Sequence, residues 1–75
     1  MARENNIYSK SHQVMGEKLK LARLEAGLTQ LAVANLLNTT QSFISKIEQS
    51  QCHLDAIELA SLAKIYKKDV EYFLS

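Results

Sequence analysis

The apolar positions of this 75-residue chain recur at intervals of three and four residues, the spacing of helices that bury one face. No stretch alternates strictly between apolar and polar residues, no Asn-Gly hairpin turn occurs, and the chain contains no proline. The pattern therefore predicts an all-α domain.

The first predicted helix runs from residue 11 to about residue 26. Ser11 is its expected N-cap, and Gly27 supplies the left-handed position that ends a helix. Its apolar positions are Val14, Met15, Leu19, Ala22 and Ala26. Residues 1–10 are polar without a period, so we expect a flexible N-terminal arm there and a single domain over residues 11–75.

Two short helices follow, separated by a turn at Asn38. Thr29 is the expected N-cap of a helix over Gln30–Leu37, and Thr40 that of a helix from Gln41 to about Gln49. The inner face of the second of these carries Ile44 and Ile47. Its outer face carries Gln41, Ser42, Ser45, Lys46 and Gln49. A short turn followed by a polar-faced helix is how proteins present side chains to the DNA major groove, so a helix-turn-helix is predicted.

The C-terminal third predicts two more helices. Asp55 and Glu58 have the spacing of a capping box and begin the fourth helix. Its apolar side contains Ile57, Leu59, Leu62, Ala63 and Tyr66. After Lys67-Lys68 breaks the pattern, Asp69 caps a last short helix through Val70, Tyr72, Phe73 and Leu74.

Composition narrows the function classes more by exclusion than by support. The net charge of +1 is far from that of a strongly basic nucleic-acid binder, and the basic excess in residues 1–24 is, on charge alone, an ordinary solvated face. A single cysteine, Cys52, fits a reducing cytoplasm. No apolar run is long enough to cross a membrane, and no residues have the spacing of a metal, cofactor or catalytic site. We therefore expect a cytoplasmic protein that is not an enzyme.

The motifs from Gly27-Leu28-Thr29-Gln30 onward resemble the Cro/C1-type (XRE-type) helix-turn-helix family. The likeness continues through Val33-Ala34, Leu37, Thr40 to Glu48, Leu54-Asp55, Ile57-Glu58-Leu59 and Leu62-Ala63-Lys64. It covers residues 15 to 74 and implies a compact five-helix bundle like the DNA-binding domain of the phage lambda repressor.

The resemblance also implies residue roles. Base contacts fall on Gln41, Ser42 and Lys46, whose side chains suit adenine, several bases and guanine respectively. Contacts to the DNA backbone fall on Gln30, Thr40, Phe43 and Ser45. Arg23 and Glu48 match a structural ion pair of the family. A homodimer contact falls on the last helix, at Val70, Tyr72, Phe73 and Leu74.

Departures from the family pattern leave a second function open. Asn38 and Ser50 stand where relatives usually have glycine, and serine fits a positive φ poorly. Leu31 and Leu36 stand at usually charged positions, and we read them as core residues at the edge of the bundle rather than as an interface. The leading prediction is a transcriptional regulator, of the small repressor or controller type, that reads double-stranded DNA at a near-palindromic operator as a homodimer.

The alternative prediction is a protein-interaction module or antitoxin that binds a partner protein through an apolar surface of the second helix. Leu31, Leu36 and Leu24 would form that surface. Phage repressors, restriction-modification controller proteins and antitoxins all remain open as subtypes, as do the operator sequence and the sign of regulation.

Overall fold

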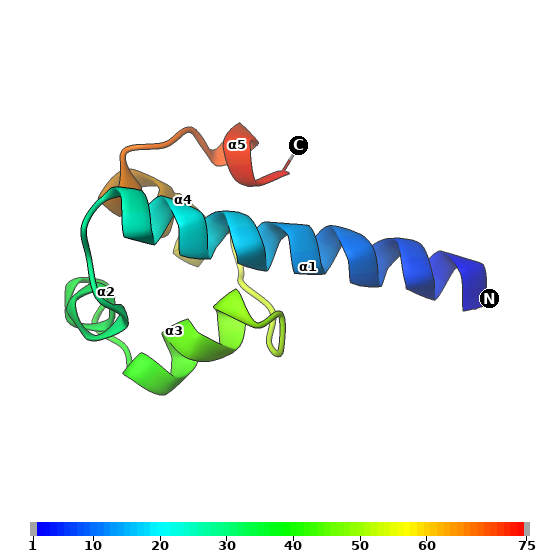
Figure 1. Ribbon diagram of the computed structural model, residues 1–75, viewed down its shortest axis with the longest axis horizontal. Coiled ribbons are helices and arrows are strands. Elements are labelled where there is room, and N and C mark those ends of the chain that lie inside the picture. The colour runs from blue at the N-terminus through cyan, green and yellow to red at the C-terminus, as the bar shows by residue number, and fades with distance from the viewer. Residues whose placement is uncertain (1, 75) are drawn as a thin grey trace.

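The computed structural model describes the backbone of residues 2–74 and the side chains from Val14 to Leu74. That part of the chain folds into five α-helices and contains no strand (Figure 1). The helices are α1 (Ala2–Glu25), α2 (Gln30–Leu37), α3 (Gln41–Glu48), α4 (Ala56–Tyr66) and α5 (Val70–Leu74). The all-α prediction is therefore confirmed.

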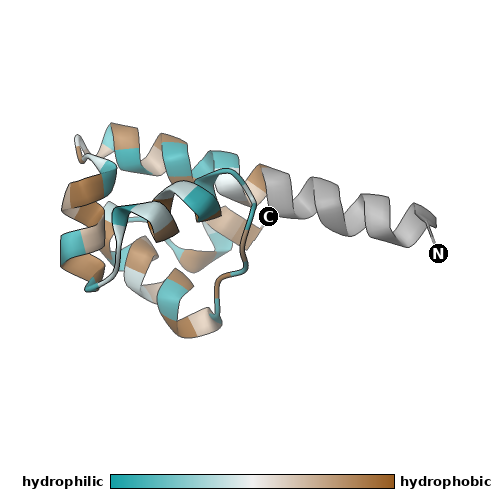
Figure 2. Cartoon of the chain, turned by 90° about the horizontal axis from the view of Figure 1, so that it is seen from below, coloured by the Kyte–Doolittle hydropathy of each residue, from teal (hydrophilic) through white to brown (hydrophobic). Residues whose placement is uncertain are grey.

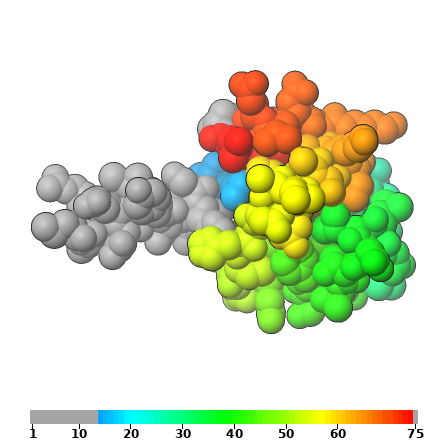
Figure 3. All heavy atoms as spheres, turned by 180° about the vertical axis from the view of Figure 1, so that it is seen from behind, coloured from blue at the N-terminus to red at the C-terminus, as the bar shows by residue number. Residues whose placement is uncertain are grey.

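The long helix α1 lies between α5 and the pair formed by α2 and α3. In Figure 1, α2 and α3 lie below α1, and α5 lies on the other side of it. The close contacts agree, because α1 packs against both α3 and α5, and α2 packs against α3 and α4. Figure 3 shows the same separation on the surface, with α2 and α3 in green at one side and α5 in red at the other.

The start of α1 differs from the sequence prediction. The helix begins at Ala2, so the expected N-cap at Ser11 is wrong and Ser11 lies inside α1. Apolar periodicity marks only the part of a helix that packs against something, and no proline or glycine between Ala2 and Met15 forces an end. The side chains of residues 1–13, His12 included, lie outside the described residues. The division between a flexible arm, 1–10, and a domain, 11–75, stays a prediction.

The starts of α2, α3 and α4 fall where the sequence places them. The hydroxyl of Thr29 accepts a hydrogen bond from the Ala32 amide at 3.0 Å, and that of Thr40 accepts one from the Phe43 amide at 3.1 Å. At α4 the capping box is complete, with Glu58 N to Asp55 Oδ1 at 2.7 Å and Asp55 N to Glu58 Oε1 at 3.1 Å. These bonds satisfy amides that a helix N-terminus otherwise leaves free.

Left-handed residues follow four of the helices, and only one of them is glycine. Gly27 has a φ of 72°, whereas Asn38, Ser50 and Lys67 have φ values of 60°, 61° and 59°. Asparagine tolerates this region through its short polar side chain. Ser50 and Lys67 are less suited, and a non-glycine residue costs about 1–2 kcal/mol there. The family's usual glycines at these places thus have a direct geometric reason.

The core forms where α1, α2, α3 and α4 meet, closed by one residue of α5. Its fully buried large side chains are Leu19, Val33, Ile44 and Leu62, with Tyr66 and Phe73 beside them. Figure 2 shows hydrophobic and hydrophilic residues alternating around these helices, as burial of one face requires.

Four apolar side chains expected in the core lie outside it. Leu31 is 55% exposed and Leu36 is 63% exposed, so the reading of both as edge-of-core residues is wrong. Val14 and Ile57 are also exposed, although helical spacing placed them with the buried set. α2 is only eight residues long and buries Val33 and Ala34, so its opposite side has nothing to pack against.

Candidate nucleic-acid interface

The three residues predicted to contact bases lie together on the outer side of α3. Gln41, Ser42 and Lys46 are exposed, and Ile44 and Ile47 on the opposite side are buried. Among the described residues, none of these three polar side chains has a hydrogen bond or ion pair within the chain. We call Gln41, Ser42 and Lys46 the recognition face. Its donors and acceptors are free to meet an external partner.

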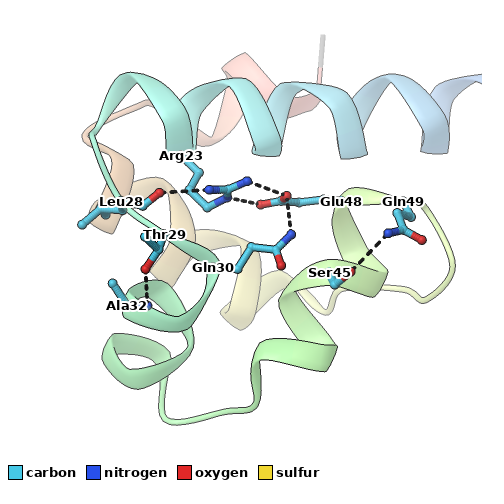
Figure 4. Close-up of polar contacts among 8 residues, drawn as sticks. All are labelled: Arg23, Leu28, Thr29, Gln30, Ala32, Ser45, Glu48 and Gln49. Carbon is cyan, nitrogen blue, oxygen red and sulfur yellow. Dashed lines mark hydrogen bonds and ion pairs between the residues drawn. The ribbon is translucent and has the colours of Figure 1, made fainter.

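Three of the residues predicted to contact the DNA backbone already make contacts within the chain. Thr40 uses its hydroxyl as the N-cap of α3. Ser45 is half-buried, and its Oγ accepts a hydrogen bond from Gln49 Nε2 at 3.2 Å (Figure 4). Phe43 is half-buried and packs against the core. All three flank the recognition face, and Gln49, which the sequence prediction left out of the site, lies beside them on the last turn.

The last residue of α3 is held by a buried ion pair with α1. Arg23 Nε lies 2.7 Å from Glu48 Oε2, and Arg23 Nη2 donates to Glu48 Oε1 at 3.2 Å. The side chains are only 9% and 3% exposed. The two-point geometry is the strong form of this pairing. The hydrogen bond to Glu48 raises the pKa of the Arg23 guanidinium, so the guanidinium stays charged.

A third nitrogen of the same guanidinium reaches the loop before α2. Arg23 Nη1 donates to the Leu28 carbonyl at 3.0 Å (Figure 4). One side chain therefore fixes the entry to α2 and the end of α3 together. This agrees with the structural role that the family resemblance implies for the pair.

Gln30 belongs to this buried group rather than pointing only outward. Its Nε2 donates to Glu48 Oε1 at 3.1 Å (Figure 4). The sequence prediction assigned Gln30 to a phosphate, and in this structure its amide nitrogen is already bonded. We call Arg23, Gln30 and Glu48 the Glu48 network. It joins α1, α2 and α3 at one point.

Gly16 is a structural residue of the site that sequence reasoning missed. A Cβ built at Gly16 would lie 2.6 Å from Ser50 Oγ, 2.7 Å from the Glu48 carbonyl oxygen and 3.0 Å from that of Ile47. Only a residue without a side chain allows α1 and the end of α3 to lie this close. The available signal was a glycine inside an otherwise helical apolar pattern.

Tyr66 is the buried polar group that the network leaves unsatisfied. Among the described residues its hydroxyl has no hydrogen-bond partner. Its pKa is raised to about 12, mainly by burial and also by the nearby Glu48 carboxylate, while Arg23 acts in the opposite direction. The phenol is therefore neutral throughout the physiological range.

The last helix divides the residues predicted for a homodimer contact. Phe73 lies in the chain's own core, and Leu74 is 65% exposed. Val70 and Tyr72 are half-buried. A buried core residue cannot also offer surface to a second copy, so Phe73 is removed from the predicted contact.

Two lysines hold α5 against the rest of the bundle. Lys18 Nζ donates to the Tyr72 carbonyl at 3.1 Å, and the Tyr72 ring lies 5.5 Å from Lys18 Nζ and 4.8 Å from Lys68 Nζ. Lys68 also pairs with Glu25 at 3.0 Å. Cation–ring contacts of this kind stabilise the placement of a short helix that cannot form alone.

No helix within the described residues is long and apolar enough to span a bilayer. Over the same residues, no group of three or more His, Cys, Asp or Glu side chains has the geometry to hold a metal ion.

These features define a helix-turn-helix domain: α2 and α3 joined by a short turn, α3 anchored at its end, and a polar face open to solvent. The family model described as a helix-turn-helix domain matches residues 14–71. The chain belongs to this family, in its XRE-type branch, as the sequence predicts.

Similar proteins agree with this placement. Two relatives described as uncharacterized HTH-type transcriptional regulators come from Rickettsia prowazekii and Rickettsia conorii. Each is 26% identical over 73 residues, which is 97% of this chain, and the chain spans 56% and 58% of their lengths.

A solved structure shares the fold. It is the restriction-modification controller protein C.AhdI from Aeromonas hydrophila, with a TM-score of 0.81 and 20% sequence identity. The match covers 88% of this chain and 96% of that protein. The predicted five-helix architecture is thereby confirmed.

Proposed function

We propose that this chain is a sequence-specific DNA-binding regulator that inserts α3 into the major groove. The observation that carries the proposal is the recognition face, in which Gln41, Ser42 and Lys46 are exposed and unpaired within the described chain, on a helix whose other end is fixed. A rigid helix with free polar groups on one side can discriminate between base edges. The role involves no chemical reaction.

We further propose that the chain acts as a homodimer on a near-palindromic operator. One domain offers few base contacts, so two linked copies are needed for useful affinity. Two-fold symmetry then places the two copies of α3 about 34 Å apart, in successive major grooves. In support, the exposed part of α5 lies on the side of α1 away from α3, so a contact there leaves the recognition face uncovered.

Binding-site selection from random double-stranded DNA tests the proposal. We expect a selected site with two-fold symmetry, and a log–log decrease of affinity with salt whose slope gives the number of phosphates neutralised. Gln41→Ala and Lys46→Ala should each lose about 1–3 kcal/mol of discrimination at one position of the half-site. Affinity and base preference that are unchanged in the double variant would contradict the proposal.

Variants of residues beside the recognition face supply the control. Thr40→Ser and Gln49→Ala alter residues beside the recognition face, and we expect them to change affinity by similar factors on every sequence. A change of base preference in these variants, rather than in Gln41→Ala, would indicate that the residues reading the bases lie elsewhere than on the recognition face.

A second candidate function, binding of a partner protein, is supported by the apolar surface of α2. Leu31 and Leu36 are both more than half exposed on α2, a short helix at the edge of the bundle. Apolar side chains that are open to solvent gain free energy when a partner protein covers them. The two functions are compatible, because neither side chain belongs to the recognition face.

A further inference from the structure

A groove opens at the end of the bundle where α1, α2 and α4 all terminate. Its volume is about 750 Å³. Leu28, Leu36 and Ile65 form its apolar lining, and Tyr66 contributes to it from the core. No lining residue comes from α3 or from the turn before it. The groove is therefore separate from the recognition face.

The groove exposes apolar surface at its mouth. Leu36 is 63% exposed, and Leu28 and Ile65 are half-buried beside it. Apolar surface in contact with water gains free energy when another apolar group covers it. The groove is open to solvent along its rim, where Ala26 and Lys67 are also exposed. Small ligands are usually held in clefts that enclose most of their surface, so this shape fits a protein segment better.

The rim of the groove carries an excess of positive charge. It contains Lys67, Lys68 and Glu25, two cations against one anion. Lys68 pairs with Glu25 at 3.0 Å, and Lys67 has no carboxylate partner among the described residues.

The negative end of the α4 dipole does not cancel this charge. The carbonyls of Ala63 and Lys64 already accept the backbone amides of Lys68 and Lys67, at 2.8 and 3.2 Å. Capped carbonyls of this kind offer less attraction to an external cation. The exposed Lys67 ammonium therefore sets the charge that an occupant should carry.

We propose that this groove docks an acidic amphipathic helix of a partner protein. Leucine-like side chains of the partner fill the space between Leu36 and Ile65, and a carboxylate pairs with Lys67. This is the helix-in-groove mode of recognition. The inference rests on the second candidate function, partner binding, and does not depend on how α3 reads DNA.

A titration of the full chain with synthetic helical peptides tests the proposal. Three peptides of roughly 16 residues, long enough to form a helix, carry the same leucine stripe and differ only in having Glu, Gln or Lys beside it. Amide resonances are followed by two-dimensional NMR. We expect shifts centred on Leu28, Leu36, Ile65 and Lys67, with affinity decreasing in the order Glu, Gln, Lys.

Matched variants separate the groove from apolar residues that are exposed elsewhere on the surface. Leu36→Glu should weaken binding of the acidic peptide more than roughly tenfold, because it removes apolar surface and adds a like charge. Lys67→Glu should weaken it about threefold to tenfold. Ile57→Glu makes a similar change at an exposed apolar residue in the first turn of α4, outside the groove, and should change affinity less than about twofold.

Five outcomes overturn the proposal. Shifts that map away from the groove, or a flat or reversed charge order, exclude an acidic helix as the occupant. Equal losses in Ile57→Glu and Leu36→Glu place binding outside the groove. Self-association that Leu36→Glu abolishes assigns the groove to a second copy. Saturable shifts with octanoate, but not with the peptides, assign it to small acids.

Failure of this proposal is distinguishable from failure of the DNA-binding proposal. Leu36 and Lys67 lie outside the recognition face, so both variants should keep the operator affinity of the unmodified chain within about twofold. Loss of peptide binding with intact operator binding supports the groove. Intact peptide binding in Gln41→Ala shows that the groove works independently of base readout.

Discussion

The Glu48 network and the recognition face meet on the same short helix, α3, and use polar groups in opposite ways. In the network, the buried side chains of Arg23 and Glu48 and the half-buried side chain of Gln30 are bonded to one another. On the recognition face, the side chains of Gln41, Ser42 and Lys46 are exposed and unbonded within the described chain. The comparison shows that different residues hold α3 in place and offer it to a partner. The bonds of the Glu48 network make α3 rigid, and they leave the polar groups of the recognition face free.

The variant with the largest expected effect removes Glu48, the residue that anchors the end of α3. Glu48→Ala leaves Arg23 and Gln30 without their buried acceptor, so we expect a loss of about 3–5 kcal/mol in the free energy of unfolding. Urea denaturation followed by circular dichroism measures it. Gln41→Ala is the control on the same helix and should lie within about 0.5 kcal/mol of the unmodified chain.

A double variant tests whether the loss comes from an uncompensated charge. Arg23→Met with Glu48→Leu removes both partners and should recover most of the stability that Glu48→Ala loses. If the double variant is as unstable as the single one, the loss in Glu48→Ala does not come from leaving the Arg23 charge uncompensated.

The next largest test moves the anchor instead of removing it. Gly16→Ala places a Cβ within 2.7 Å of the Glu48 carbonyl oxygen, which is backbone and cannot rotate away. We expect a loss of about 1–3 kcal/mol in unfolding free energy from overpacking. The same change in an open helix gains about 1 kcal/mol, so the sign of the effect is decisive.

Operator binding provides the second measurement on Gly16→Ala. A displaced end of α3 should weaken binding although no DNA-contacting residue has changed. Glu17→Ala, on an exposed position of the same helix, is the control for both measurements. A gain in stability for Gly16→Ala would show that α1 and the end of α3 leave room for a Cβ at this position.

The smallest test concerns the one unsatisfied group beside the network. Tyr66→Phe removes a buried hydroxyl that has no partner among the described residues, so the unfolding free energy at neutral pH should stay the same or rise by up to about 1 kcal/mol. A clear loss would mean that the hydroxyl has a partner, such as a buried water molecule.

The pH dependence of stability gives an independent check on Tyr66. Its pKa is about 12 in the folded chain against 10.0 in the unfolded one, so the unfolded chain releases the proton first. Stability should therefore decrease as the pH rises from 10 towards 12. Other groups titrate there too, so the readout is the difference from Tyr66→Phe, which should lose less stability over this range.

Local bonds explain why so much of the fold could be predicted. The N-caps at Thr29, Thr40 and Asp55 use side chains within three residues of the amides that they satisfy, so the sequence alone locates them. The same is true of the polar side of α3, where helical periodicity separates the recognition face from Ile44 and Ile47.

Contacts between distant segments explain what could not be predicted. Gln30 reaches Glu48, and Gly16 meets the end of α3, across separations that no periodicity reports. Leu36 is exposed because no helix covers that side of α2, which is a property of the assembled bundle. The start of α1 at Ala2 escaped prediction for a related reason, since apolar spacing marks burial and not backbone conformation.

The sequence by itself determined the helices that end in local signals, their caps and turns, and the polar side of α3, because these depend on interactions over one helical turn. Only the tertiary structure decided which polar groups are already bonded, where glycine is required by a close helix contact, and that three helix ends enclose an apolar groove. Those properties depend on distances between segments that packing, and not local chemistry, brings together.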